Sequence, residues 1–168
     1  HRQKPPFNPR LVIVGREVVE GYRRVAGLMD IGRWTLFLPP TREVFKWYAA
    51  ADACVLLTWY DPCSRVVLEA TRWRIPSMTT AHNGAADVLR RGAGVVVSSP
   101  RAKADVIRGF DALADAGRRA AMSARCAAVA GELSMDRHVE QLLDIYEGVR
   151  GTTTIVSARP SAGDRRRP

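Results

Sequence analysis

Residues 61–70 read Asp61-Pro62-Cys63-Ser64-Arg65-Val66-Val67-Leu68-Glu69-Ala70. This stretch directly follows the apolar run 53–58, which is typical of a buried strand. It also begins an amphipathic segment that is typical of a helix. Asp61 is a favourable N-cap residue, and Pro62 suits the first position of a helix. We therefore predict a strand, a turn at Asp61 and a helix from residue 63 to about residue 73.

The stretch carries two carboxylates, on Asp61 and Glu69. On one helix they would lie about 12 Å apart along the axis and on nearly the same side. Between them the backbone N–H groups of Cys63, Ser64 and Arg65 would be free to bind an anion. This layout suits a ligand with sugar hydroxyls at one end, a phosphate in the middle and a ribose at the other end. The plainer alternative is an N-cap followed by a solvated Glu69 that pairs with Arg65.

Strand and helix patterns alternate along the chain, and we therefore predict the α/β class. The predicted strands are 11–14, 34–38, 53–58, 76–80 and 94–97. The expected architecture is a Rossmann-like parallel sheet of about five strands with helices on both faces, followed by a helical C-terminus. Ligands of such sheets bind at the carboxyl ends of the strands. Gly15, Asp61 and Asn83 follow predicted strands, so we expect them to share one site.

The net charge of +9 over 168 residues is concentrated at the two ends of the chain. Residues 1–10 carry +3 and residues 150–168 carry +4, which leaves +2 for the rest. We expect 1–10 to be a linker or a cut end, 11–149 to form the ligand-binding domain, and 150–168 to be a disordered basic tail. The basic ends leave a weak contact with a membrane surface open, whereas nucleic-acid binding is not expected.

The three cysteines, Cys54, Cys63 and Cys126, are widely spaced and form neither a metal-binding pattern nor a disulfide framework. We therefore expect a cytoplasmic protein without a bound metal, with peripheral contact at the inner membrane face as an option. The sequence contains no apolar run of membrane-spanning length and no signal-peptide pattern. His82 lies in a predicted loop without a nearby nucleophile, and no catalytic residue is assigned.

Several motifs together resemble those of the retaining GT-B glycosyltransferases of family 4, also called group 1. The acidic-x7-acidic pattern from Asp61 to Glu69 is followed by a segment, 75–80, similar to the family's next strand. The segment 47–53, Trp-Tyr-Ala-Ala-Ala-Asp-Ala, resembles the family's stretch before the motif. The turn 83–87, Asn-Gly-Ala-Ala-Asp, is similar to that of the lipopolysaccharide-core-type branch. The resemblance covers about residues 11–148.

The resemblance implies the C-terminal, donor-binding half of such an enzyme. The donor would be a nucleotide diphosphate sugar, and no further cofactor would be needed. The sugar would pass with retention of configuration to an acceptor glycan or glycolipid, held by an N-terminal domain that this sequence lacks. We therefore expect this chain alone to bind a donor weakly and to transfer nothing.

The resemblance also assigns roles to individual residues. Asp61 and the stretch Ser64, Arg65 and Val66 would bind the donor sugar, and Glu69 would bind the ribose hydroxyls. The phosphate-side loops would contain Gly15, Arg16, Asn83 and Gly84. The backbone of Leu38 would contact the base.

The sequence departs from the family pattern at several positions. Asp61 is shorter than the usual glutamate, only one glycine follows the first strand, and Arg74 stands where a glycine would end the helix. Two alternatives stay open. One is a fragment of a GT-B nucleotide-sugar epimerase, and the other is a non-catalytic module that binds a nucleotide sugar or another anion.

Overall fold

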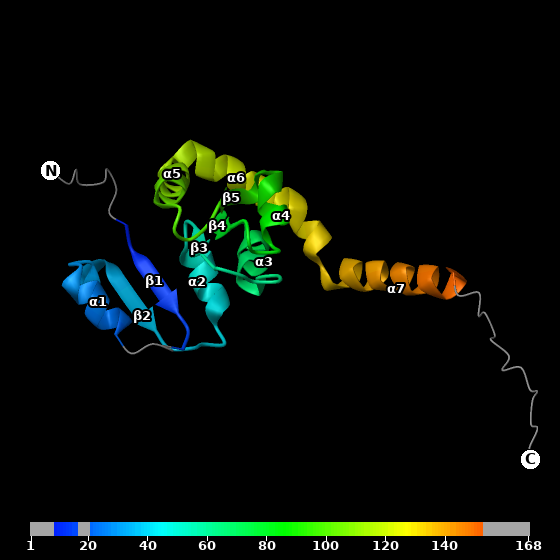
Figure 1. Ribbon diagram of the computed structural model, residues 1–168, viewed down its shortest axis with the longest axis horizontal. Coiled ribbons are helices and arrows are strands. Elements are labelled where there is room, and N and C mark those ends of the chain that lie inside the picture. The colour runs from blue at the N-terminus through cyan, green and yellow to red at the C-terminus, as the bar shows by residue number, and fades with distance from the viewer. Residues whose placement is uncertain (1–8, 17–20, 153–168) are drawn as a thin grey trace, which may run out of the picture. The chain divides into compact units, whose positions relative to one another are not determined.

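The computed structural model describes residues 9–16 and 21–152, and Figure 1 shows the elements of the chain. The strands are β1 (Leu11–Val14), β2 (Thr35–Leu38), β3 (Cys54–Leu56), β4 (Ser77–Thr80) and β5 (Gly94–Val97). The α-helices are α1 (Tyr22–Leu28), α2 (Val44–Ala50), α3 (Arg65–Arg72), α4 (Ala86–Val88), α5 (Lys103–Ala114), α6 (Ala116–Ala130) and α7 (Met135–Thr152). Three shorter helical segments are η1 (Gly32–Trp34), η2 (Leu89–Ala93) and η3 (Gly131–Leu133). The predicted α/β class and the helical C-terminus are confirmed.

The strands pair in parallel within each sheet, but the five described strands form two sheets instead of the single sheet that we expected. β1 pairs with β2, and the second sheet has the order β3-β4-β5. The apolar residues of β1 indicated a strand covered on both faces. Leu11, Val12 and Ile13 are instead 39–49% exposed. Among the described residues, β3 is a three-residue strand at the edge of its sheet, and all three residues pair with β4.

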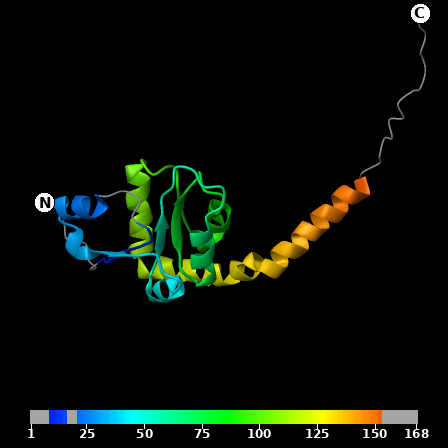
Figure 2. The ribbon, with the colours of Figure 1, turned by 90° about the horizontal axis from the view of Figure 1, so that it is seen from below.

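The three-stranded sheet is covered on both faces, as Figure 2 shows from below. Alternate residues of a strand point to opposite faces. Val96 of β5 accordingly packs against a buried cluster that the covering helices contribute: Val67 from α3, Leu89 from η2 and Cys126 from α6. Its neighbour Val97 belongs to the second cluster, with Met78 and Leu113 of α5. These two small cores hold β3 and β4 in place and thereby fix the loops that follow them.

Helix α3 ends in a tight turn in which Arg74 has a positive φ of 61°. The Arg74 amide donates to Thr71 O at 2.9 Å, and the Ile75 amide donates to Ala70 O at 2.9 Å. These two bonds are the pair that closes a Schellman motif, in which glycine is preferred at the left-handed position. Arg74, which stands where the family pattern has a glycine, therefore holds a strained left-handed conformation.

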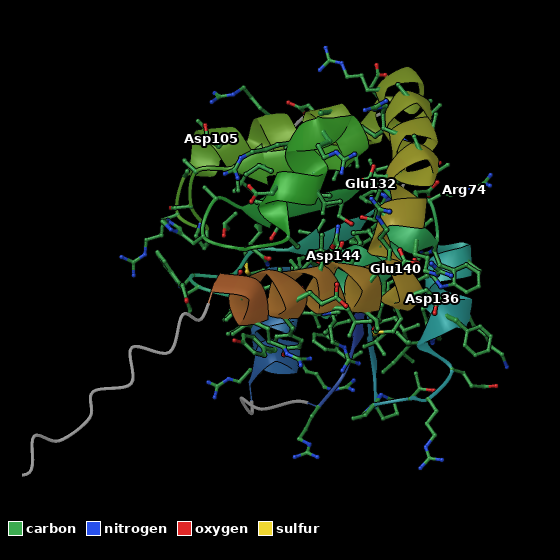
Figure 3. All side chains as sticks on the ribbon, turned by 90° about the vertical axis from the view of Figure 1, so that its right-hand side faces the viewer. Arg74, Asp105, Glu132, Asp136, Glu140 and Asp144 are labelled. Atoms are coloured by element: carbon green, nitrogen blue, oxygen red, sulfur yellow. The ribbon has the colours of Figure 1, made fainter. Side chains whose placement is uncertain are left out.

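The chain divides into two compact units, residues 1–131 and 132–168. In the second unit, the Ser134 hydroxyl accepts a hydrogen bond from the Arg137 amide at 3.2 Å where α7 begins. Asp136, Glu140 and Asp144 follow one another along α7 (Figure 3). Most of the predicted terminal segments, residues 1–8 and 153–168, lie outside the described residues, while residues 150–152 belong to α7. No helix in the described part of the chain is long and apolar enough to cross a membrane.

Candidate functional site

A pocket of about 340 Å³ lies where β3 and β4 end. Its walls come from the loop after β3, the loop after β4 and the beginning of the helical segment that follows. The lining residues are Tyr60, Asp61, Pro62, Ala81, His82, Asn83, Gly84, Asp87 and Arg90. Three residues of the predicted site therefore surround one cavity at the carboxyl ends of parallel strands.

Asp61 begins a turn and does not cap the helix, in contrast to our prediction. Its Oδ1 accepts a hydrogen bond from the Cys63 amide at 3.1 Å, two residues further on. Helix α3 starts only at Arg65, with Ser64 in the N-cap position and no side-chain capping bond. Asp61 and Glu69 are therefore not on one helix, and the helical spacing that we applied to this pair was wrong.

Asn83 joins the two loops of the pocket. Its side chain is buried, and the Asn83 Oδ1 accepts from the amides of Ser64 at 3.3 Å and Ala85 at 2.9 Å. Its Nδ2 donates to Thr58 Oγ1 at 3.4 Å. A single amide side chain thus satisfies backbone groups that would otherwise be buried without a partner.

Backbone hydrogen bonds reinforce this junction. Asp61 and Asn83 form an isolated parallel bridge, in which the Asp61 amide donates to His82 O at 3.2 Å and the Gly84 amide donates to Asp61 O at 3.0 Å. A Cβ at Gly84 would overlap the carbonyl oxygen of Pro62. Only glycine therefore allows the two loops to approach this closely.

The anion site at the start of α3 is smaller than we predicted. Of the three amides expected to be free, that of Cys63 is held by Asp61 and that of Ser64 by Asn83. The amides of Arg65 and Val66 belong to the first turn of the helix, where no acceptor exists within the helix itself. They are the backbone donors that this end of the helix offers.

Glu69 is held from two sides. The Arg65 Nη2 lies 3.7 Å from Glu69 Oε1, so the plainer alternative of an ion pair within the helix is present. In addition, the buried Tyr48 hydroxyl donates to Glu69 Oε2 at 3.1 Å. Burial, and then the hydrogen bond to Glu69, raise the pKa of Tyr48 well above its usual value. Tyr48 therefore stays protonated and remains a donor at ordinary pH.

A second group of predicted site residues lies at the carboxyl ends of β1 and β2. The Gly15 amide donates to Leu38 O at 3.1 Å, and Gly15 has a φ of 149°, which favours glycine. This bond uses one of the two acceptor positions of the Leu38 carbonyl oxygen. Arg16 follows as an exposed residue. Within the described residues, no hydrogen bond or ion pair links this group to the one around Asp61.

Two features of the site had no counterpart in our sequence analysis. Tyr48 is buried in α2, and its bond to Glu69 was not foreseen from the sequence. The Arg101 guanidinium lies 5.0 Å from the ring centroid of Trp59 and joins the loops after β3 and β5.

His82 is exposed at the pocket. The described residues contain no group of three or more His, Cys, Asp or Glu that could hold a metal ion.

The strand order and the helices on both faces define a Rossmann-like α/β domain, and its pocket lies at the carboxyl ends of the strands, where ligands of such sheets bind. Comparison with known proteins then identifies the family. The family model described as Glycosyl transferases group 1 matches residues 1–115, and the chain belongs to this family.

Individual relatives agree with this assignment. The chain is 27% identical over 147 residues to the D-inositol 3-phosphate glycosyltransferase of Thermomonospora curvata, covering 86% of this chain and 34% of the relative. WaaG, a glycosyltransferase involved in lipopolysaccharide biosynthesis, has a similar structure with a TM-score of 0.70 at 23% identity, over 83% of this chain and 38% of WaaG. The resemblance to group 1 enzymes of the GT-B fold is thereby confirmed.

A third relative has been solved with a ligand. Anabaena Alr3699/HepE in complex with UDP-glucose matches with a TM-score of 0.65 at 17% identity, over 84% of this chain and 41% of that protein. Identities this low show the fold alone. The chain spans between a third and about two fifths of the length of these three relatives.

Proposed function

We propose that this chain is the donor-binding domain of a retaining glycosyltransferase and binds a nucleotide diphosphate sugar. One observation carries the proposal: of the three residues that we expected to share one site because they follow predicted strands, Asp61 and Asn83 line a single pocket at the carboxyl ends of β3 and β4. The complex of a structural relative with UDP-glucose supports this class of ligand.

The proposed roles follow from the chemistry of each group. The Asp61 carboxylate accepts hydrogen bonds from sugar hydroxyls, and its remaining acceptor sites are available because only Oδ1 is used by Cys63. The amides of Arg65 and Val66 meet the diphosphate or the sugar at the positive end of α3. The Glu69 carboxylate binds the ribose hydroxyls. Gly15 and Leu38 would lie on the phosphate and base side of the donor.

The reaction as a whole needs more than this chain. Because the relatives are more than twice as long, we propose that the acceptor is bound by a further domain of the complete protein. Transfer with retention, a glycan or glycolipid acceptor and weak contact with the inner membrane face belong to that proposal. The three thiols are free, which supports a reducing, cytoplasmic setting.

Calorimetric titration with UDP, GDP, ADP and their glucose conjugates tests the proposal. We expect saturable, weak binding of one nucleotide series and loss of that binding in Glu69→Ala. Asp61→Ala should weaken binding of the sugar conjugate more than binding of the free nucleoside diphosphate, because Asp61 is proposed to contact only the sugar. Glu140→Ala, on α7 in the second unit, is the matched control and should bind like the unaltered chain. Equal affinity of Glu69→Ala and the unaltered chain would refute the assignment.

A further inference from the structure

The Glu69 carboxylate has two neighbours that differ greatly in exposure. The side chain of Arg65 is 89% exposed and that of Glu69 is 41% exposed, and their closest atoms are 3.7 Å apart. An ion pair of this kind is weak, because water and salt screen it and both side chains move. Tyr48 is only 7% exposed and donates to Glu69 Oε2 at 3.1 Å. A buried hydroxyl that bonds a carboxylate oxygen restrains it far better.

Tyr48 is itself held in place by the packing of α2 against α3. Its hydroxyl also lies 3.4 Å from the carbonyl oxygen of Val66, one turn before Glu69. At the far end of α3, the ring of Phe45 stacks on that of Trp73, with centroids 6.4 Å apart and planes at 18°. Two contacts along α2 therefore fix the Tyr48 hydroxyl relative to the helix that carries Glu69.

We infer that Tyr48 is a positioning residue that orients the Glu69 carboxylate for the two ribose hydroxyls and makes the site selective for ribonucleotides. The inference rests on the proposed function, because it takes Glu69 as the ribose ligand. A carboxylate receives two vicinal hydroxyls well only when its plane is fixed. Tyr48 occupies one acceptor position on Oε2 and fixes that plane before the ligand arrives. The other acceptor positions remain for the ribose.

Tyr48→Phe removes only the hydroxyl and keeps the packed ring, so it isolates the hydrogen bond. The matched control is Tyr22→Phe, since Tyr22 is 57% exposed in α1 and has no role in the proposed site. The full chain is titrated with UDP, GDP and ADP, and with the 2′,3′-dideoxy form of each. Thermal unfolding of each variant establishes that it is folded at the temperature of the titration.

We expect Tyr48→Phe to weaken binding of whichever ribonucleotide the unaltered chain binds by about tenfold, the scale of one hydrogen bond to a charged group. Binding of its dideoxy form should change less than twofold, since that ligand makes no bond to Glu69. The ratio of the two affinities should therefore fall in Tyr48→Phe as it does in Glu69→Gln, and should stay constant in Tyr22→Phe.

The outcomes separate the inference from the function on which it rests. If Tyr48→Phe weakens both forms equally or neither form, Tyr48 does not position Glu69 and the inference is overturned. If Glu69→Gln leaves the ratio unchanged, Glu69 is not the ribose ligand, and both the assignment and the inference fail. If none of the three ribonucleotides binds the unaltered chain, the proposed function fails and the inference fails with it.

Discussion

Asn83→Ala tests the junction between the two loops of the pocket. The substitution removes the Oδ1 acceptor of the Ser64 and Ala85 amides and the Nδ2 donor to Thr58. Ser64 is 4% exposed and Ala85 is 1% exposed, so bulk water does not reach the two amides in the folded state. Each buried amide left without an acceptor costs about 1–3 kcal/mol, and one water in the vacated space offsets part of this. We expect a loss of about 3 kcal/mol in the free energy of unfolding.

Urea unfolding, followed by far-ultraviolet circular dichroism and by tryptophan fluorescence, measures this loss. A chain of this size is stable by about 5–15 kcal/mol, so the variant should fold and its midpoint should shift clearly. Thr58→Val is the matched control, because it keeps the Asn83 acceptor oxygen for both amides and removes only the Thr58 Oγ1 partner of Nδ2. It should lose less than half as much as Asn83→Ala.

Two results would contradict this reasoning. A loss below about 1 kcal/mol in Asn83→Ala would mean that the two amides find other partners at little cost. An equal loss in Thr58→Val would mean that the bond from Asn83 Nδ2 to Thr58, and not the shared acceptor, holds the loops together.

Three further substitutions or conditions have expected outcomes. Gly84→Ala should lower the thermal midpoint and cost about 2 kcal/mol, since its Cβ would overlap the Pro62 carbonyl and the loops would have to separate; unchanged stability would argue against their close approach. Arg74→Gly relieves the positive φ of 61° and should raise the free energy of unfolding by about 1 kcal/mol in urea titrations. A decrease would mean that the arginine side chain stabilises the fold by more than its backbone strain costs. Burial raises the pKa of the Cys126 thiol from near 9 to about 11. The contribution of this thiol to the free energy of unfolding should therefore be fully present below about pH 9 and should be lost as the pH rises through about 11. Cys126→Ala should remove that part of the alkaline loss, and in the native chain at pH 8 a thiol reagent should modify the exposed Cys63 long before Cys126.

The alternation of apolar and amphipathic segments was enough to predict most elements, because each is determined by its own residues. The strand predicted at 94–97 is β5 without a shift. The start of α3 could not be predicted in this way. Asp61 and Ser64 are both good N-cap residues, and the choice between them depends on Asn83, which takes the Ser64 amide from nineteen positions away.

The site was predictable where it depended on the general geometry of parallel sheets. Loops after neighbouring parallel strands meet at one edge, and Asp61 and Asn83 are indeed bridged. The bond between Tyr48 and Glu69 depends instead on how α2 packs against α3. Helical periodicity places Tyr48 toward the core, but it does not say which atom its hydroxyl meets.

These two kinds of contact imply two kinds of variant. Asn83 is buried in the junction that shapes the pocket, and Gly84 lies against the Pro62 carbonyl there, so changing either residue should reduce stability and ligand binding together. The hydroxyl of Tyr48 and the carboxylate of Glu69 bond at the edge of the packed region, where Glu69 is still 41% exposed and water can replace a lost partner. Changing them should affect binding with little loss of stability. Measuring both stability and binding for these variants would separate the residues that shape the pocket from those that contact the ligand.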